Sequence, residues 1–298
     1  YTHMTEFFGP VLAVMRFERL GDAVSLVNQT GYGLTSGLES LDEREWDFWK
    51  EHIRAGNLYI NRVTTGAIVL RQPFGGMGKS GFGPGMKAGG PNYVAQFMDF
   101  EDTGASQPDG VPQLPSLAAV FAGLQARPQD GDARIVAAML SYERNQREEF
   151  GAEHDHFRLV GQDNVRRYLP VGDVRVRIHP DDTLFEVFGR ACAAHVAGCR
   201  VVISTPPGLD APAVQRLEQV TESWAGAIEF VEETDAQLAQ AIRGGQVDRV
   251  RYAAPGRASL EVLQAGNAAN GCVVSVPVSA EGRLELLWYV REQSISTD

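Results

Sequence analysis

Hydrophobic positions recur at helical or strand spacing along most of the chain and divide it into a series of short elements. In the first hundred residues, the pattern predicts helices that begin at Asp22 and Asp42 and strands over 34–38 and 58–60. The first helix is expected to reach about Thr30, and the second to end where Gly56 supplies a left-handed residue. This part of the chain therefore predicts two helices, each followed by a strand.

From residue 165 onward, short apolar runs alternate with segments of helical periodicity. The expected strands lie at 174–178, 200–204, 227–231, 250–252 and 273–276, and the expected helices at 184–197, 211–224, 235–242 and 258–265. Strands that alternate with helices of this length imply a largely parallel sheet covered on both faces. The predicted fold class is α/β.

The segments between these patterns suggest how the chain is divided. Residues 64–90 are rich in glycine, which suits loops that a backbone or a ligand approaches closely. The stretch at 103–128 begins with many Gly, Ser, Pro and Gln residues and is interpreted as a linker. We therefore expect a first domain over 1–102 and a second over 129–298, with a long helix at its start.

Composition excludes several classes of protein. Of 298 residues, 44% are hydrophobic and 22% charged, which describes a globular protein with a substantial core. The formal net charge is −11, mostly from residues beyond 100, and so acidic a surface makes nucleic acid a poor partner. No apolar run approaches the roughly 20 residues of a membrane-spanning helix, and no secretion signal is present, so we expect a cytoplasmic protein.

The three cysteines are an odd number without a Cys-x-x-Cys pair, which argues against a disulfide framework or a structural zinc site. We expect Cys192, Cys199 and Cys272 to be small buried residues. The histidines stand singly or two apart in a charged stretch, so no metal site is predicted.

Three motifs near the start give the chain a family resemblance. They are Glu-Phe-Phe-Gly-Pro-Val at 6–11, Gly-Asn-Leu-Tyr-Ile-Asn at 56–61 and Gln-Pro-Phe-Gly-Gly at 72–76. In this order and spacing they resemble the carboxyl half of the catalytic module of the aldehyde dehydrogenase superfamily. Thr-Gly-Ala at 65–67 and Lys-Ala-Gly-Gly-Pro at 87–91 are similar to the glutamate-semialdehyde (pyrroline-5-carboxylate) dehydrogenases.

The resemblance implies an NAD site near the start of the chain. The carboxylate of Glu6 would accept hydrogen bonds from the ribose hydroxyls beside the nicotinamide, and Phe8 would pack near that end of the cofactor. A carboxylate can accept from two hydroxyls at once, and the following Gly-Pro fixes the turn that directs it. The alternative is that Glu6 is an ordinary surface acid and Phe8 a core residue.

The resemblance also implies a substrate site for glutamate semialdehyde. Backbone amides around Gly66 and Ala67 would bind the substrate carboxylate, because amides in a glycine-containing loop cost little ordering entropy. Related enzymes often have a serine at the position of Ala67, so one hydroxyl contact is missing here. Phe74 would line the aldehyde pocket, unless it serves only to pack its own loop.

The family mechanism uses a cysteine thiolate, hydride transfer to NAD and a glutamate-activated water. None of the three cysteines stands in a context that fits this role. In addition, Gly9-Pro10 leads into an apolar run with no helix or strand predicted before it, as expected if the sequence begins inside a domain. We therefore expect the nucleophile and the base to precede Tyr1, and this chain alone to be inactive.

The second half resembles a degenerate copy of the aldehyde dehydrogenase nucleotide-binding domain, through residues 164–172 and 193–207. Thr205 stands where working domains carry a lysine that holds the adenosine ribose. Such a tail is similar to the carboxyl-terminal domain of long members of the proline utilization A family, whose flavin-dependent proline dehydrogenase half would lie outside this chain. Partners implied are the amino-terminal remainder of the same protein and further copies of it.

Two alternatives stay open at this stage. The chain as a whole would serve as a noncatalytic assembly or lid module that covers the active site or tunnel of a partner domain. A regulatory nucleotide-binding domain would instead need a Gly-x-Gly-x-x-Gly turn in the second half, and no such turn occurs there.

Overall fold

The computed structural model describes residues 1–101, 110–269 and 272–298, which form two compact units. The first unit comprises residues 1–93, 153–167 and 292–298, and the second comprises 94–152 and 168–291. The expected division into 1–102 and 129–298 differs from these units, because two later segments return to the first one. Part of the expected linker, residues 102–109, lies outside the described residues, and helix α3 (Pro115–Ala126) occupies most of the rest.

The first unit is built on a four-stranded sheet. Its strands, in spatial order, are β2 (Thr35–Leu38), β3 (Asn57–Ile60), β11 (Val290–Thr297) and β5 (Asp163–Pro170). β3 is parallel to both neighbours, with Asn57 opposite Thr35 on one side and Ser294 on the other. β1 (Tyr32–Gly33) and β4 (Met77–Gly78) pair separately as a small antiparallel ladder. The strand predicted at 58–60 thus becomes the centre of a sheet that residues from the far end of the sequence complete.

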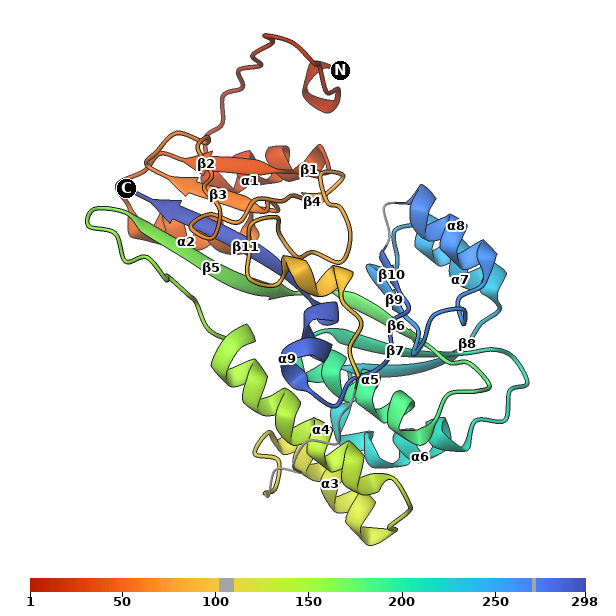
Figure 1. Ribbon diagram of the computed structural model, residues 1–298. Coiled ribbons are helices and arrows are strands. Elements are labelled where there is room, and N and C mark those ends of the chain that lie inside the picture. The colour runs from red at the N-terminus through yellow and green to blue at the C-terminus, as the bar shows by residue number, and fades with distance from the viewer. Residues whose placement is uncertain (102–109, 270–271) are drawn as a thin grey trace. The chain divides into compact units, whose positions relative to one another are not determined.

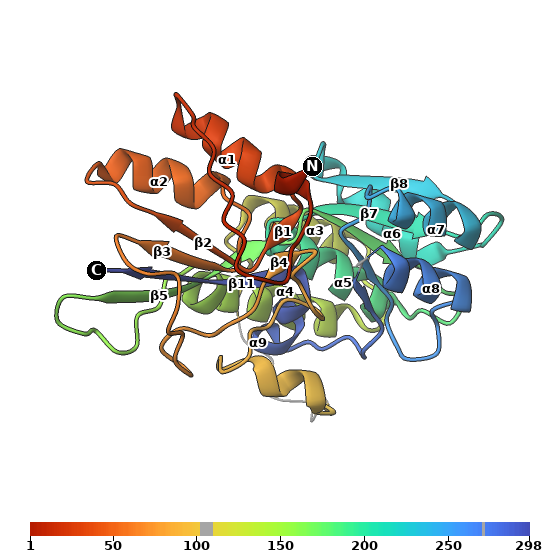
Figure 2. The same cartoon turned by 90° about the horizontal axis from the view of Figure 1, so that it is seen from above.

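Two helices, α1 (Leu20–Gln29) and α2 (Glu43–His52), cover one face of this sheet, as Figure 2 shows. The core between them consists of the buried residues Val24, Trp49, Ile53, Ala55, Leu58, Ile60 and Ile295. These residues come from both helices, the segment that joins α2 to β3 and two strands, which is the amphipathic packing that the hydrophobic spacing predicts.

The helix ends correct two expectations. Asp42 does cap α2, accepting a hydrogen bond of 2.9 Å from the Arg44 amide, but Asp22 lies inside α1 and pairs with Arg19. α2 ends at His52, and Gly56 is not a left-handed terminator. Its requirement for glycine is steric, since a Cβ there would lie 1.9 Å from the Gly75 carbonyl oxygen.

The second unit contains a five-stranded sheet in which every pair is parallel. Its spatial order is β10 (Cys272–Val274), β9 (Arg249–Arg251), β6 (Asp173–Arg177), β7 (Arg200–Thr205) and β8 (Ile228–Glu232). Counted along the chain this is the 3-2-1-4-5 arrangement of a doubly wound nucleotide-binding fold. The predicted parallel α/β sheet is confirmed.

Helices lie on both faces of this sheet (Figure 1). α5 (Leu184–Val196) and α6 (Pro212–Val220) connect the strands on one side, and α7 (Asp235–Arg243) and α8 (Leu260–Ala268) those on the other. The strand order reverses direction after β8, and because crossovers are right-handed, the helices before and after β8 lie on opposite faces of the sheet. α4 (Asp132–Asn145), a π turn (Gln146–Phe150) and α9 (Gly282–Glu285) complete the unit, and no helix of the described residues is long and apolar enough to cross a membrane.

Candidate functional site

The segment that carries Glu6 and Phe8 is exposed. It follows a short 3-10 turn (Thr2–Met4), and a 2.7 Å hydrogen bond from the His3 ring to the Leu26 carbonyl oxygen ties it to α1. Phe8 is 96% exposed, and Glu6 makes no hydrogen bond or ion pair within the described part of the chain. A free carboxylate suits an acceptor for ribose hydroxyls, but the NAD role of both residues stays a prediction.

Gly66 and Ala67 lie in the loop over residues 62–71, which follows β3. Gly66 has a φ of +86°, a conformation that favours glycine, and a Cβ there would meet nothing within 4 Å. Neither amide donates a hydrogen bond to a described residue, so both are available to an acceptor from outside. The arrangement is compatible with carboxylate binding and does not test it.

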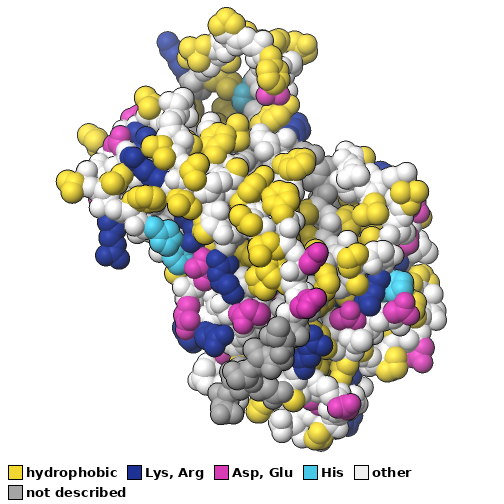
Figure 3. Space-filling view, in the orientation of Figure 1, with side chains coloured by type: hydrophobic (Ala, Val, Ile, Leu, Met, Phe, Trp, Pro, Cys, Tyr) yellow, Lys and Arg dark blue, Asp and Glu magenta, His cyan; other side chains and the backbone are white. Residues whose placement is uncertain are grey.

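This loop presents apolar side chains to the surface, and Figure 3 shows hydrophobic groups gathered over the first unit. The large apolar residues exposed in the loop are Val63, Ile68, Val69 and Leu70, each more than half exposed. Singly exposed apolar residues are ordinary on a protein surface, whereas a contiguous group of this kind is typical of an interaction face.

The structure brings together the motifs at 56–61, 72–76 and 87–91, while the motif at 6–11 lies in the exposed segment described above. Phe74, which is 39% exposed, donates a backbone hydrogen bond of 2.9 Å to the Ala88 carbonyl oxygen, and the Gly75 amide donates to the Asn57 side chain at 3.2 Å. The segments at 56–61, 72–76 and 87–91 therefore form one cluster, although their shared surroundings could not be read from the spacing alone. Whether Phe74 lines an aldehyde pocket stays a prediction.

Lys87 lies at the centre of this cluster, and sequence reasoning assigned it no role of its own. Its Nζ donates to the carbonyl oxygen of Gly56, to Asn57 Oδ1 at 2.9 Å and to Ser294 Oγ at 3.3 Å. Burial lowers the pKa of Lys87 to about 7, although the Coulombic attraction of Glu292 opposes the shift. Lys87 thus holds the motifs together by donating to oxygen acceptors from two neighbouring strands.

Glu292 belongs to the same buried centre. Its carboxylate accepts hydrogen bonds from the Lys87 amide at 2.8 Å and from Asn92 Nδ2 at 2.5 Å. Burial raises its pKa above the ordinary value, and these donors limit the rise. No signal in the sequence singled out Glu292, because it lies in a polar strand with no motif around it.

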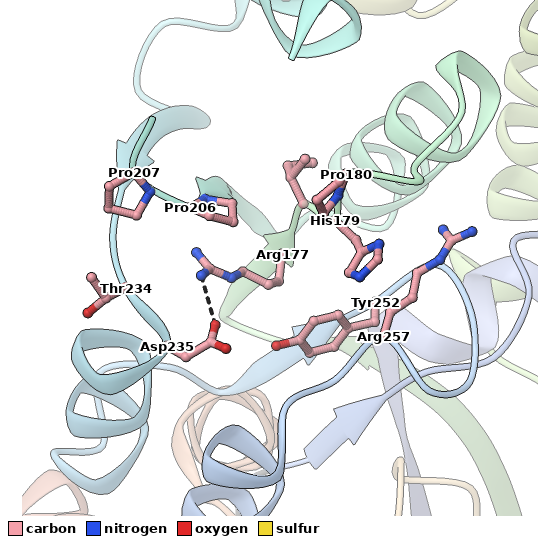
Figure 4. A pocket seen from close by; sticks show the side chains of 10 residues that line it. Arg177, His179, Pro180, Pro206, Pro207, Thr234, Asp235, Tyr252 and Arg257 are labelled. Atoms are coloured by element: carbon pink, nitrogen blue, oxygen red, sulfur yellow. Dashed lines mark hydrogen bonds and ion pairs between the residues drawn. The ribbon is translucent and has the colours of Figure 1, made fainter. Parts of the chain in front are cut away.

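A pocket lies at the carboxyl ends of the parallel strands of the second unit, where doubly wound folds bind ligands (Figure 4). Its volume is about 310 Å³, and it is lined by Arg177, Ile178, His179, Pro180, Pro206, Pro207, Thr234, Asp235, Tyr252 and Arg257. Figure 4 shows the Tyr252 ring beside the pair formed by Arg177 and Asp235.

The charges of this pocket are compensated within the protein. Arg177 pairs with Asp235 at 2.8 Å and also donates to Ser204, while Arg257 pairs with Asp182 at 2.6 Å and with Glu186 at 3.1 Å. The Tyr252 hydroxyl has no hydrogen-bond partner of good geometry among the described residues, and burial raises its pKa to about 12. Among the described residues that line the pocket, both arginines are paired with acids, so neither offers a free cation to a pyrophosphate, and the noncatalytic role of this unit stays a prediction.

The three cysteines are free thiols that differ in burial. Cys192 and Cys199 are buried, as predicted, while Cys272 is partly exposed and all three are free. Burial raises the pKa of the Cys192 and Cys199 thiols to about 12, so neither is a thiolate near neutral pH. Among the described residues, no group of three or more His, Cys, Asp or Glu side chains is arranged to hold a metal ion.

Comparison with known proteins agrees with the motifs. Residues 2–102 match the aldehyde dehydrogenase family model. Over 95 residues the chain is 52% identical to the bifunctional protein PutA of Rhizobium meliloti, an alignment that covers 31% of this chain and 8% of that protein. It is 43% identical over 98 residues to the 1-pyrroline-5-carboxylate dehydrogenase of Bacillus cytotoxicus, covering 33% of this chain and 19% of the relative.

A solved structure extends the likeness to both units. Proline utilization A from Corynebacterium freiburgense matches 99% of this chain, with 33% identity and a TM-score of 0.73, and the match covers 26% of that protein. The chain therefore spans only a small part of the relatives it matches. Residues 2–102 thus match the aldehyde dehydrogenase family, in a chain that is similar along almost its whole length to part of a proline utilization A protein.

Proposed function

We propose that this chain is part of an NAD-dependent L-glutamate γ-semialdehyde dehydrogenase that produces glutamate in proline catabolism. The observation that carries the proposal is the 52% identity to a bifunctional PutA protein over 95 residues. The clustered motifs lie within residues 2–102, which match the aldehyde dehydrogenase family model. The likeness of both units to a proline utilization A structure supports the same reading. NAD, when bound, supplies the hydride acceptor.

The residues of this chain would bind and orient the reactants. Glu6 would accept hydrogen bonds from the nicotinamide ribose, and Phe8 would pack beside that end of the cofactor. The amides of Gly66 and Ala67 would donate to the substrate carboxylate, since both are exposed and uncommitted. Phe74 would place an apolar wall along the substrate chain.

The thiol nucleophile would come from a part of the protein beyond these 298 residues. The high thiol pKa values of Cys192 and Cys199 support that view. The second unit would be noncatalytic, because its carboxyl-edge pocket pairs each arginine with an acid and carries Thr205 on the neighbouring strand end. That pairing favours a structural role over nucleotide binding.

The test uses a full-length protein that contains this chain. Glu6→Ala should lower the rate of semialdehyde-dependent NAD reduction at least about tenfold, as expected for loss of hydrogen bonds to a charged group. Proline oxidation by the same protein should stay unchanged. Glu18→Ala, which removes another exposed acid from the same extended segment, is the matched control and should retain both activities. Equal activity in the two variants would contradict the assignment of Glu6.

A further inference from the structure

The loop over residues 62–71 is fixed at both ends by arginine side chains. Arg62, at its start, donates to Ser296 Oγ at 2.5 Å and lies 3.6 Å from the Asp298 carboxylate. Arg71, at its end, donates to the side chain of Gln162. Both partners belong to segments far away in the sequence, on strand β11 and just before strand β5.

The two ends are joined to each other by a continuous chain of side-chain hydrogen bonds. Ser296 Oγ donates to Asn164 Oδ1 at 3.1 Å, and Asn164 Nδ2 donates to Gln162 Oε1 at 3.2 Å. Gln162 Nε2 in turn donates to Asp298 Oδ1 at 2.6 Å, which returns to Arg62. The result is a closed ring of polar contacts beneath the loop.

A further contact attaches the ring to the following motif. Gln72 Nε2 donates to Asn164 Oδ1 at 3.0 Å, and Gln72 and Asn164 are both 3% exposed. Gln72 begins the motif that contains Phe74. The ring therefore connects the two proposed substrate-binding elements, which are the loop and this motif. Buried polar networks of this kind fix a geometry, because breaking one contact leaves other groups without partners.

Between its ends the loop has few restraints of its own. Its middle residues are exposed, and the described backbone contacts hold only its last part, where Leu70 donates to Gly89 and Gln72 to Ile68, both at 2.7 Å. The position of the Gly66 and Ala67 amides therefore depends on where the two ends are held.

We propose that Arg62 and Arg71, with Ser296 and Asn164, are positioning residues that preorganise the Gly66 and Ala67 amides for the carboxylate of the substrate. This inference rests on the proposed function. A loop ordered before binding costs less entropy when the ligand arrives, so the ring raises affinity for the carboxylate-bearing aldehyde without contacting it. Its effect is on substrate selectivity, because an aldehyde with no carboxylate makes no use of these amides.

Ser296→Ala and Arg62→Met in the full-length protein test the proposal, with pentanal as an aldehyde that lacks the carboxylate. We expect the KM for glutamate semialdehyde to rise about five- to tenfold, as for a lost hydrogen bond, with kcat and the KM for pentanal unchanged. Ser296→Thr, which retains the hydroxyl, should restore the KM. Equal effects on both aldehydes, or no effect on either, would overturn the proposal.

Hydrogen exchange on the 298-residue chain separates this proposal from the proposed function. The amides of Leu70 and Gln72, which donate to Gly89 and Ile68 at the end of the loop, should exchange at least about threefold faster in Ser296→Ala than in the wild type. Asn28→Ala is the control, since Asn28 bridges His52 and Arg54 elsewhere in the same unit. Unchanged exchange at the loop overturns the positioning role, whereas a wild-type full-length protein that does not oxidise the semialdehyde overturns the proposed function and the selectivity derived from it.

Discussion

Lys87 shows how one buried cation determines the local structure around it. It is 2% exposed and donates to oxygen atoms contributed by the residues before and within β3 and by β11. An amine buried so completely pays a desolvation cost that its acceptors offset only while they stay in place. The cluster of motifs is therefore sensitive to the protonation of a single side chain.

The first prediction at the residue scale concerns how the free energy of unfolding depends on pH. Burial lowers the pKa of Lys87 in the folded protein to about 7, whereas the ordinary pKa of a lysine is 10.5. Between these two pH values the unfolded chain therefore binds more protons than the folded one. The free energy of unfolding should therefore rise as the pH increases from 7 to 9.5. Lys87→Met should remove this contribution, which denaturant titrations at several pH values would measure.

Lys79→Met is the matched control for that experiment, because Lys79 Nζ makes an exposed contact of 2.9 Å with the Thr30 carbonyl oxygen in the same unit. It should leave the pH dependence of the wild type intact. A Lys87→Met variant with the wild-type slope would show that another group is responsible.

The buried cysteines give a prediction of the opposite kind, an expected lack of effect. Cys192→Ala and Cys199→Ala in the full-length protein should leave the rate of NAD reduction within about twofold, because thiols with a pKa of about 12 are not nucleophiles at neutral pH. Steady-state rates with thermal melts as a check on folding would measure this. A large loss of rate in a variant that melts like the wild type would place a catalytic cysteine in this chain.

At the scale of elements, the sequence predicted most of the second unit and less of the first. Apolar runs such as 200–204 identify buried parallel strands, because their burial requires hydrophobic residues on both faces. β11 was missed because it is buried yet polar. Its residues Glu292, Gln293, Ser294 and Ser296 are at most 3% exposed, and their hydrogen-bond partners are backbone and side-chain groups remote in sequence. Such partners are set by tertiary structure, which single-sequence periodicity does not contain.

The candidate site, too, was predicted only in part from the sequence. The motifs identified Gly66, Ala67 and Phe74 through their resemblance to a family, and the structure placed the motifs together without testing those roles. The ring that includes Arg62 and Asn164 could not be predicted, because its members are spread over three separate segments of the sequence. Hydrogen-bonded polar residues leave no periodic trace when each one has a different partner.

The carboxyl-edge pocket of the second unit yields a prediction about ligand binding. Calorimetric titration with NAD of the 298-residue chain carrying Glu6→Ala, which removes the carboxylate proposed to contact NAD in the first unit, should show no saturable binding in the micromolar range, which would correspond to about −8 kcal/mol. The reason is that Arg177 and Arg257 are already paired with acids. Saturable binding that Tyr252→Phe or Arg177→Ala abolishes would instead make this pocket a working nucleotide site.

At the scale of the whole molecule, the described chain passes back and forth between its two units. Residues 153–167 leave the second unit to supply β5 to the first, and residues 292–298 return there again as β11. A division of the sequence at one linker therefore cannot separate the units. This explains why the boundary expected near 103–128, reasonable by composition, does not coincide with the organisation of the fold.

The position of β11 in the sequence has a consequence for folding during synthesis, because β11 is made long after β3. β3 needs β11 as its neighbour, and the roughly 230 residues between them take about 10 to 50 seconds to translate at 5–20 residues per second. During that time one edge of β3 offers its hydrogen-bonding groups to any strand that meets it, a recognised route to aggregation. The sheet of the first unit thus stays incomplete during synthesis until β11 has been made.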